Sequence, residues 1–317
     1  MVTRFGSREI CDVTFKALVE NQRVGNKDFH AGQPVFVIDT ATASNMEQAS
    51  TTVYAQGGRG YNRLIAWEGE KTLTFTVTDA LMSPLGLAIL TGAGFKGEED
   101  VKHIHATYDV AIDAEGKGAI EARDLAVELG LAETATVQVC NDTKLKAYAT
   151  ILDHNGAVQG WVDEVTLSGT PSTTVENVIE ITGTDTLDID AQDAAGKNIR
   201  LDFYVRMTTG ATEITIKPDD FGGFFYVEAD TLYRSQDGKD MAATLTFPKV
   251  KIQSGFTLSM APTGDPSTFD FVMDAMSAYT YFDHTHKVVC DITIVSGESA
   301  SNEGAQHSNP VEHESKN

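Results

Sequence analysis

Cysteine, proline and basic side chains are all scarce in this chain of 317 residues. Cys occurs only 3 times, an odd and small number that excludes a disulfide framework. Lys and Arg number 24 against 46 Asp and Glu, so the formal net charge at pH 7 is −22. A negative excess of this size disfavours a basic groove for nucleic acid and disfavours binding to an anionic membrane surface.

A long uninterrupted apolar run is also missing. The most apolar stretch, residues 80–95, is interrupted by Ser83 and Pro84 and is shorter than the roughly 20 residues that a membrane-spanning helix needs. The first five residues do not begin the apolar run of a signal peptide. We therefore expect a protein that has no membrane partner and is assembled in the cytoplasm.

What the chain does contain is a period of two in its apolar residues. Cys11, Val13 and Phe15 alternate with polar residues, and four further stretches repeat this pattern. Such alternation is typical of antiparallel strands with one face on a core and the other in solvent. The stretches are residues 11–17, 72–77, 199–206, 269–275 and 288–294. The sequence therefore predicts a mainly β globular protein, with one large β domain or about two domains.

Two short helices are expected among these strands. Ser83 can cap a helix, Pro84 suits its first turn, and Gly92 can end it. A second helix is predicted near residues 119–129, ending at Gly130. Helix is therefore a minority of the predicted fold.

Two polar segments predict loops or turns. Residues 42–62 are small and polar, and we expect a long loop between strands near 35–38 and 64–67. A loop of this length in a compact domain is usually functional or flexible. Residues 262–266 read Pro-Thr-Gly-Asp-Pro and predict a turn that joins two strands of a hairpin.

The character of the chain changes over residues 96–197, where acidic turns join short strands. We interpret this segment as a β-rich subdomain inserted into one β-barrel domain made of residues 1–95 and 198–295. Residues 296–317 are polar, carry four Glu and have few apolar side chains. They cannot offset the entropy of ordering by burial, so we expect a flexible acidic tail.

Glycine-rich and acidic motifs that would bind a ligand are incomplete. Residues 57–60 read Gly-Gly-Arg-Gly but lack the Lys-Ser/Thr of a phosphate-binding loop. Residues 113–124 resemble a calcium loop, yet Lys117 stands at a ligand position, and residues 185–193 lack the glycine of that loop.

Histidine and cysteine patterns are incomplete as well. Histidines at 103 and 105, and at 284 and 286, could share a strand face, but no third ligand at zinc spacing accompanies either pair. The Cys residues fall in apolar, strand-like stretches and are expected to be buried thiols. Without a nucleophile elbow or a catalytic pair, we predict a protein that is not an enzyme and has no catalytic residue, cofactor or metal ion.

Three stretches of the chain stand out together, namely residues 52–60 with 64–75, residues 225–231 with 247–252, and residues 264–271. In these stretches the chain resembles bacteriophage tail tube proteins, the major tail proteins of large tailed phages. The resemblance covers residues 1–95 and 198–295, and the inserted segment departs from the minimal family pattern.

The resemblance implies an antiparallel β-sandwich or barrel of the tail tube type with a flanking helix. Such subunits are homo-oligomeric, forming hexameric rings that stack into a tube. DNA crosses the tube during ejection without specific binding. Sheath, baseplate and tape-measure proteins are the partners implied, and the location implied is the virion tail, assembled in the host cytoplasm.

The resemblance also implies which side chains would matter. The long loop would be the contact between rings, and its candidate residues are Met46, Tyr54, Arg59 and Tyr61. A lumen that lets DNA pass needs an acidic or neutral lining. The candidates on the polar faces of alternating strands are Asp12, Asp202, Asp270 and Asp274. With only 8 Pro, the chain has few residues that block strand edges against neighbouring subunits.

Other functions stay open at this point. The chain could be another virion structural protein, such as a baseplate or capsid decoration protein. A secreted β-sandwich module that binds carbohydrate would need a surface aromatic cluster, and the chain has only 2 Trp. A metal-dependent enzyme would need a complete ligand set.

Overall fold

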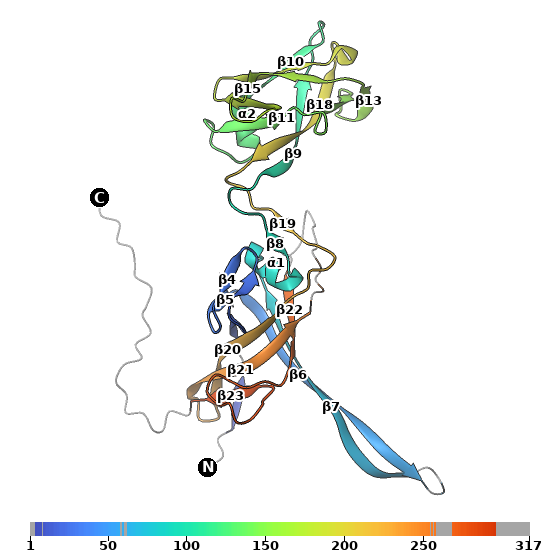
Figure 1. The fold of residues 1–317 in the computed structure, drawn as a ribbon. Coiled ribbons are helices and arrows are strands. Elements are labelled where there is room, and N and C mark those ends of the chain that lie inside the picture. Colours follow the sequence, from blue (N-terminus) through green and yellow to red (C-terminus); the bar gives the residue numbers. More distant parts are fainter. Residues whose placement is uncertain are drawn as a thin grey trace, which may run out of the picture. The chain divides into compact units, whose positions relative to one another are not determined.

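The computed structural model describes residues 4–7, 9–57, 59, 62–253, 255, 257 and 268–295. Within these residues the chain is mainly β with antiparallel pairing, which confirms the predicted fold class. The chain divides into two compact units (Figure 1). The first unit is Met1–Gly94 with Ile214–Asn317, and the second unit is Phe95–Glu213.

A nine-stranded sheet forms the body of the first unit. Its strands are β1 (Phe5–Ser7), β2 (Asp12–Ala17), β5 (Pro34–Ile38), β6 (Ala41–Gly57), β7 (Asn62–Asp79), β20 (Phe224–Ser235), β21 (Asp240–Ile252), β22 (Phe269–Ala275) and β23 (Asp291–Ile294). The order is β5-β2-β20-β21-β22-β7-β6, with β1 beside β20 and β23 beside β21. Two short ladders are separate from it, β3 (Gln22–Val24) with β4 (Lys27–Phe29) and β8 (Gly94–Phe95) with β19 (Ile214–Thr215).

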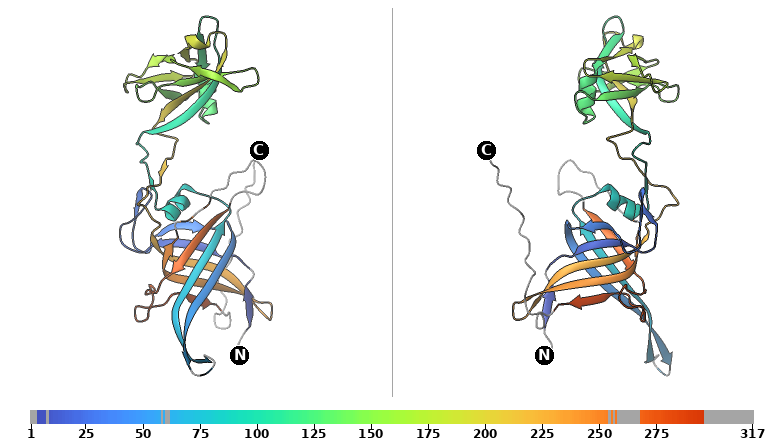
Figure 2. Two further views of the ribbon diagram at one scale, coloured as in Figure 1. Left: turned by 90° about the vertical axis from the view of Figure 1, so that its right-hand side faces the viewer. Right: turned by 60° about the vertical axis from the view of Figure 1, so that its left-hand side comes forward.

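The two edges of this sheet are strands that follow each other in the chain. β5 ends at Ile38 and β6 begins at Ala41, so only about 10 Å of chain joins the two edges. The rings of Phe15 on β2 and Phe271 on β22 have centroids 6.0 Å apart, although three strand spacings of about 4.8 Å separate these strands in the sheet order. The sheet is therefore strongly curled (Figure 2). Because β5 and β6 do not pair within the described residues, the curled sheet is not a closed barrel there.

Curling encloses one face of the sheet and creates the core of the first unit. Alternate residues of β2, β7, β20, β21 and β22 form one buried apolar cluster. Phe75 and Phe247, two strands apart in the sheet order, stack with their ring centroids 4.9 Å apart. The period of two that the sequence shows thus marks the inner face of the curl.

Helix α1 (Pro84–Thr91) covers part of this core. The Ser83 hydroxyl accepts a hydrogen bond of 3.0 Å from a first-turn N–H, and Gly92 ends the helix in the left-handed conformation with φ 74°. These are the cap and the end that the sequence predicted. Ile89 and Leu90 carry the packing, because both are buried in the apolar cluster.

The second unit has a core of its own between two sheets. Its seven-stranded sheet contains β9 (Lys102–Ala111), β11 (Thr136–Cys140), β12 (Tyr148–Leu152), β13 (Val158–Val162), β15 (Thr170–Pro171), β16 (Val178–Thr182) and β18 (Asn198–Met207). The three-stranded sheet contains β10 (Lys117–Glu121), β14 (Thr166–Ser168) and β17 (Thr186–Asp190). Helix α2 (Ala122–Glu128) and the 3-10 helix η1 (Gln192–Ala194) complete the unit.

A buried lysine holds the base of the second unit together. Lys102 is only 3% exposed, and its ammonium group donates hydrogen bonds to the carbonyl oxygens of Gly97, Glu98 and Thr208 at 2.8, 3.0 and 3.1 Å. The two stretches of chain that begin and end this unit are thus bonded to one side chain.

The boundaries differ from the sequence-based division in three places. The second unit continues to Glu213 rather than to residue 197, because β18 pairs with β9, β11 and β12. The predicted second helix begins three residues late, since residues 119–121 belong to β10 and pair with β17. The last predicted strand begins at Asp291 instead of 288. The predicted turn at 262–266 and the predicted tail at 296–317 lie outside the described residues.

The curl predicts that Phe15 is a key residue for stability. Its ring lies 5.9–6.0 Å from the rings of Phe36, Phe225 and Phe271, and its side chain is fully buried. We expect Phe15→Ala to lower the free energy of unfolding by about 3–5 kcal/mol, because it leaves a cavity between four strands. Urea denaturation followed by circular dichroism measures the change.

The matched control is Phe282→Ala, which removes a ring that is 89% exposed. That substitution should change the free energy of unfolding by less than about 0.5 kcal/mol. Equal destabilisation by the two variants would contradict a core enclosed by the curl.

Candidate assembly interface

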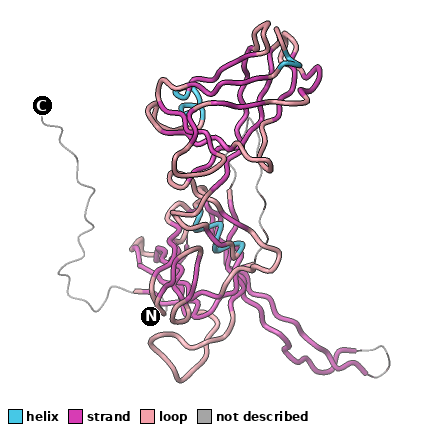
Figure 3. Tube along the Cα trace, turned by 45° about the horizontal axis from the view of Figure 1, so that its top comes forward, coloured by secondary structure: helices cyan, strands magenta, loops and turns pink. Residues whose placement is uncertain are grey.

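Strands β6 and β7 form a hairpin that extends beyond the sheet (Figures 1 and 3). The other neighbour of β7 is β22, which pairs only with Leu73–Asp79. Residues 62–72 of β7 therefore pair only with β6, and β6 pairs only with β7 within the described residues. We call residues 49–57 and 62–72 the distal hairpin. Nearly all of its described side chains are exposed, because no element covers either face.

The prediction of a long loop at residues 42–62 is wrong. Most of these residues are in β6, and Leu64–Trp67 lies on the same strand as Leu73–Val77. The sequence pattern failed because residues 42–52 show no regular alternation of apolar and polar side chains. The short apolar face that follows, at Val53 and Ala55, is too brief to indicate a strand by itself. The Thr, Val and Tyr residues of the segment do favour a strand, and they were the signal available.

A bulge bends the hairpin where it leaves the sheet. The register shifts between Ser50 and Thr52, and the Glu70 N–H donates a hydrogen bond of 2.9 Å to the Thr51 hydroxyl. A Cβ atom at Gly69 would lie 2.5 Å from that hydroxyl oxygen, so glycine permits the close approach of the two strands.

One face of the distal hairpin is apolar. Val53 lies opposite Trp67, and Ala55 lies opposite Ile65, so that these four side chains share a face. Val53, Ile65 and Trp67 are each more than half exposed, and Leu64 beside them is too. The sequence-based candidates did not include these residues. A loop prediction for residues 42–62 gave no reason to expect that Val53 and Ala55 pair with Trp67 and Ile65.

The residues that the sequence did nominate are scattered along the hairpin. Met46 and Tyr54 lie on β6 and are partly exposed, and Arg59 is an exposed turn residue. Tyr61 lies outside the described residues. Tyr54 is on the face opposite Trp67, where the guanidinium of Arg63 covers its ring at 4.2 Å. That contact occupies the ring within its own chain.

The outer face of the curled sheet is rich in carboxylates and threonines. Asp12 lies directly opposite Asp230, and the Thr244 hydroxyl donates a hydrogen bond of 2.6 Å to Asp230. Asp270 accepts one of 2.6 Å from Thr78, and Asp274 accepts one of 3.3 Å from Thr74. Three predicted lining residues, Asp12, Asp270 and Asp274, therefore share one face of one sheet.

The fourth predicted lining residue lies elsewhere. Asp202 is on β18 in the second unit, where its carboxylate is 2.9 Å from Nε2 of His105. The structure therefore does not bring Asp202 together with the other three. Its alternating pattern was read correctly as a strand, but alternation does not tell which sheet a strand joins.

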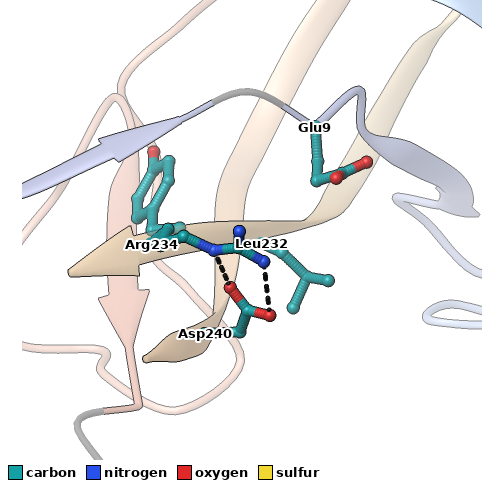
Figure 4. Close-up of a pocket in the computed structure, with 5 residues that line it drawn as sticks. Glu9, Leu232, Arg234 and Asp240 are labelled. Carbon is teal, nitrogen blue, oxygen red and sulfur yellow. Dashed lines mark hydrogen bonds and ion pairs between the residues drawn. The ribbon is translucent and has the colours of Figure 1, made fainter. Parts of the chain in front are cut away.

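A hollow of about 350 Å³ lies where β20 and β21 meet (Figure 4). Glu9, Leu232, Tyr233, Arg234 and Asp240 line it. Two hydrogen bonds of 2.5 and 2.9 Å join the guanidinium of Arg234 to the Asp240 carboxylate and hold the pKa of Asp240 below its usual value. The described lining has no Ser, Cys or His, so the hollow holds an ion pair and no nucleophile with a base.

The residues that could bind a metal ion or act as nucleophiles are dispersed over the described structure. Within the described residues, no three His, Cys, Asp or Glu side chains gather as metal ligands. The Asp113 carboxylate accepts the N–H groups of Glu115 and Lys117 at 3.0 and 2.7 Å, which stabilises a turn. Burial raises the pKa of Cys140 and raises that of Cys290 to about 11, so these thiols are weak nucleophiles. None of the described helices is long and apolar enough to span a membrane.

Comparison with known proteins identifies a family. The family model of the YomU/Tube protein family matches residues 17–289, whereas no curated protein matches the chain. The matched span includes residues 96–197, which our interpretation placed outside the family pattern. With the match extending over most of a chain that is mainly antiparallel β, the chain belongs to the YomU/Tube protein family of phage-derived tube proteins, and its role is that of a structural protein of the phage tail tube.

Proposed function

We propose that this chain forms hexameric rings that stack into a tail tube, through which DNA passes during ejection. Sheath, baseplate and tape-measure proteins are the partners that such a tube requires, and the virion tail is assembled in the host cytoplasm. Family membership supports the tube, and the surfaces described above support the manner of assembly.

The distal hairpin is the observation that carries this proposal. An isolated two-stranded hairpin is marginal in water, and this one exposes Val53, Ile65 and Trp67 on a single face. Burying an apolar side chain of this size contributes roughly 1.5–3 kcal/mol. Contact with a neighbouring subunit in the tube would supply that burial.

The unpaired edge of the sheet at β6 also supports assembly with a neighbouring subunit. β6 runs over Ala41–Gly57 and pairs only with β7 among the described residues, so its other side carries unpaired N–H and C=O groups. Edge strands of this length normally are covered or paired. A neighbouring subunit that continues the sheet would pair them.

The outer face of the curled sheet suits a lumen for DNA. Its carboxylates at Asp12 and Asp270 have no base opposite them: Asp12 faces Asp230, and Asp270 accepts a hydrogen bond from Thr78. Asp274 lies opposite Lys251 and accepts hydrogen bonds from Thr74 and Gln253. DNA carries one negative charge per about 1.7 Å of its axis, and uncompensated carboxylates would keep phosphates from binding. We propose this face, without Asp202, as the lining of the tube.

Removing Trp67 should impair tube growth. With Trp67→Ser we expect the protein concentration at which tubes appear to rise about 30-fold, because a contact worth roughly 2 kcal/mol is lost. Light scattering across a concentration series measures the onset, and negative-stain microscopy identifies tubes.

Trp161→Ala is the matched control, because it removes the other exposed Trp, which lies in the second unit. This variant should form tubes at the concentration of the unmodified protein. Normal growth of Trp67→Ser would show that the distal hairpin is not the contact.

Reversing charge on the outer face should make the tube retain DNA. In tubes of Asp12→Lys/Asp270→Lys, lysines replace carboxylates, and we expect salt-sensitive binding of linear DNA because phosphates displace counterions there. Cryo-electron microscopy of the tubes mixed with DNA locates the DNA. Tubes of Asp202→Lys serve as the control and should leave the lumen empty. DNA in the lumen of that control alone would reverse our assignment of the lining.

A further inference from the structure

Two exposed aromatic side chains occupy diagonal positions on the open face of the seven-stranded sheet in the second unit. Trp161 on β13 is 77% exposed, and Tyr148 on β12 is 64% exposed. Trp161 pairs with Thr150, and Tyr148 is two residues before Thr150 on the same strand. The two rings are therefore diagonal neighbours on one face, with Cα atoms roughly 7–8 Å apart.

These rings have no aromatic partner within the described residues. The ring pairs of the second unit are limited there to His105 with Tyr204. Tyr148 lies opposite Asp202 on β18, so Tyr204 is its diagonal neighbour on the other side from Trp161. Large apolar side chains this exposed on a regular strand usually mark a binding surface when they are grouped. Trp161 and Tyr148 thus form a small platform, which we call the aromatic platform.

A polar hollow adjoins the aromatic platform. It measures about 230 Å³, and Tyr148 is part of its wall together with residues 141–143, 146–147 and 162–166. The side chains of Asn141, Lys146, Asp163 and Glu164 line it and form no hydrogen bond or ion pair with any described residue. The hollow therefore offers donors and acceptors that are free to bind a ligand.

The rest of this sheet face is polar and already bonded internally. Arg200 holds Asp109 through two hydrogen bonds of 2.7 and 2.8 Å, and His105 lies 2.9 Å from Asp202. A surface that buries a protein partner normally has an apolar centre much larger than two rings. The large exposed apolar side chains of β12 and β13 are limited to the platform and Val158, which favours a small or linear ligand over a protein.

The charge of the second unit narrows the ligand class. Residues 95–213 contain 9 Lys and Arg against 22 Asp and Glu, so the unit repels anionic polymers. A neutral glycan has the complementary chemistry. Its pyranose rings present C–H faces that pack on aromatic rings, and its hydroxyl groups pair with carboxylates and amides.

We propose that Trp161 and Tyr148, together with the polar hollow beside them, bind a neutral glycan built of pyranose rings. The rings of the platform stack on sugar faces, and Asn141, Asp163 and Glu164 accept or donate hydrogen bonds to sugar hydroxyls. This site lies wholly in the second unit and does not depend on the proposed role of the distal hairpin.

Affinity electrophoresis of the full chain tests the proposal. Native gels contain dextran, soluble starch, galactomannan or hydroxyethylcellulose as neutral polymers, and dextran sulfate as the anionic one. We expect retardation by at least one neutral polymer, with an apparent affinity that falls at least about tenfold in Trp161→Ala and in Tyr148→Ala. Trp161→Phe should retain part of the binding, because an aromatic face remains.

The control variant is Phe282→Ala, which removes a ring of the first unit that is 89% exposed and should leave retardation unchanged. Circular dichroism checks that each variant is folded. Mobility unaffected by every neutral polymer would overturn the proposal, as would retardation that persists in Trp161→Ala and Tyr148→Ala. Retardation by dextran sulfate alone would instead indicate anion binding. Loss of tube growth in Trp161→Ala with unchanged glycan binding would indicate a contact between subunits.

Discussion

The short connection between Ile38 and Ala41 constrains the rest of the first unit. It joins strands at opposite edges of a nine-stranded sheet, so the sheet has to curl until those edges are close. Curling brings Phe15 to 6.0 Å from Phe271 across three strand spacings and so creates an enclosed apolar face. The same curl turns the carboxylates and threonines of the alternate positions outward. The short connection therefore forces the curl, and the curl gives the sheet an apolar inner face and a polar outer face.

The distal hairpin follows from a mismatch of strand lengths. β7 has 18 residues, but β22 pairs with only its last seven, from Leu73 to Asp79. Among the residues that the structure describes, the remaining length has no neighbour except β6. Its apolar face at Val53, Ile65 and Trp67 therefore gains little stability from the chain's own core. We therefore propose this face as a contact between subunits, because covering it would remove exposed apolar area from water.

The strands of the second unit also have one buried face and one exposed face, but their exposed face is stabilised differently. Its strands bury one face in a core of their own and cross-link the opposite face with ion pairs such as Arg200–Asp109. Exposed ion pairs contribute little to stability, but they keep an open face polar and soluble. The aromatic platform at Trp161 and Tyr148 departs from that pattern, which is why it points to binding rather than to packing.

The sequence by itself determined the β character, the family and the ends of helix α1. Alternation over residues 11–17, the cap at Ser83 and the glycine at 92 are local signals, and local backbone preferences decide them. Tertiary structure alone decided that β18 joins the second unit, that Asp202 and Asp12 belong to different units, and that residues 42–57 are a strand. Each of these depends on hydrogen bonds to strands distant in the chain. A period of two indicates which face of a strand is buried. It does not indicate which strands pair with each other, and it does not reveal strands that are exposed on both faces.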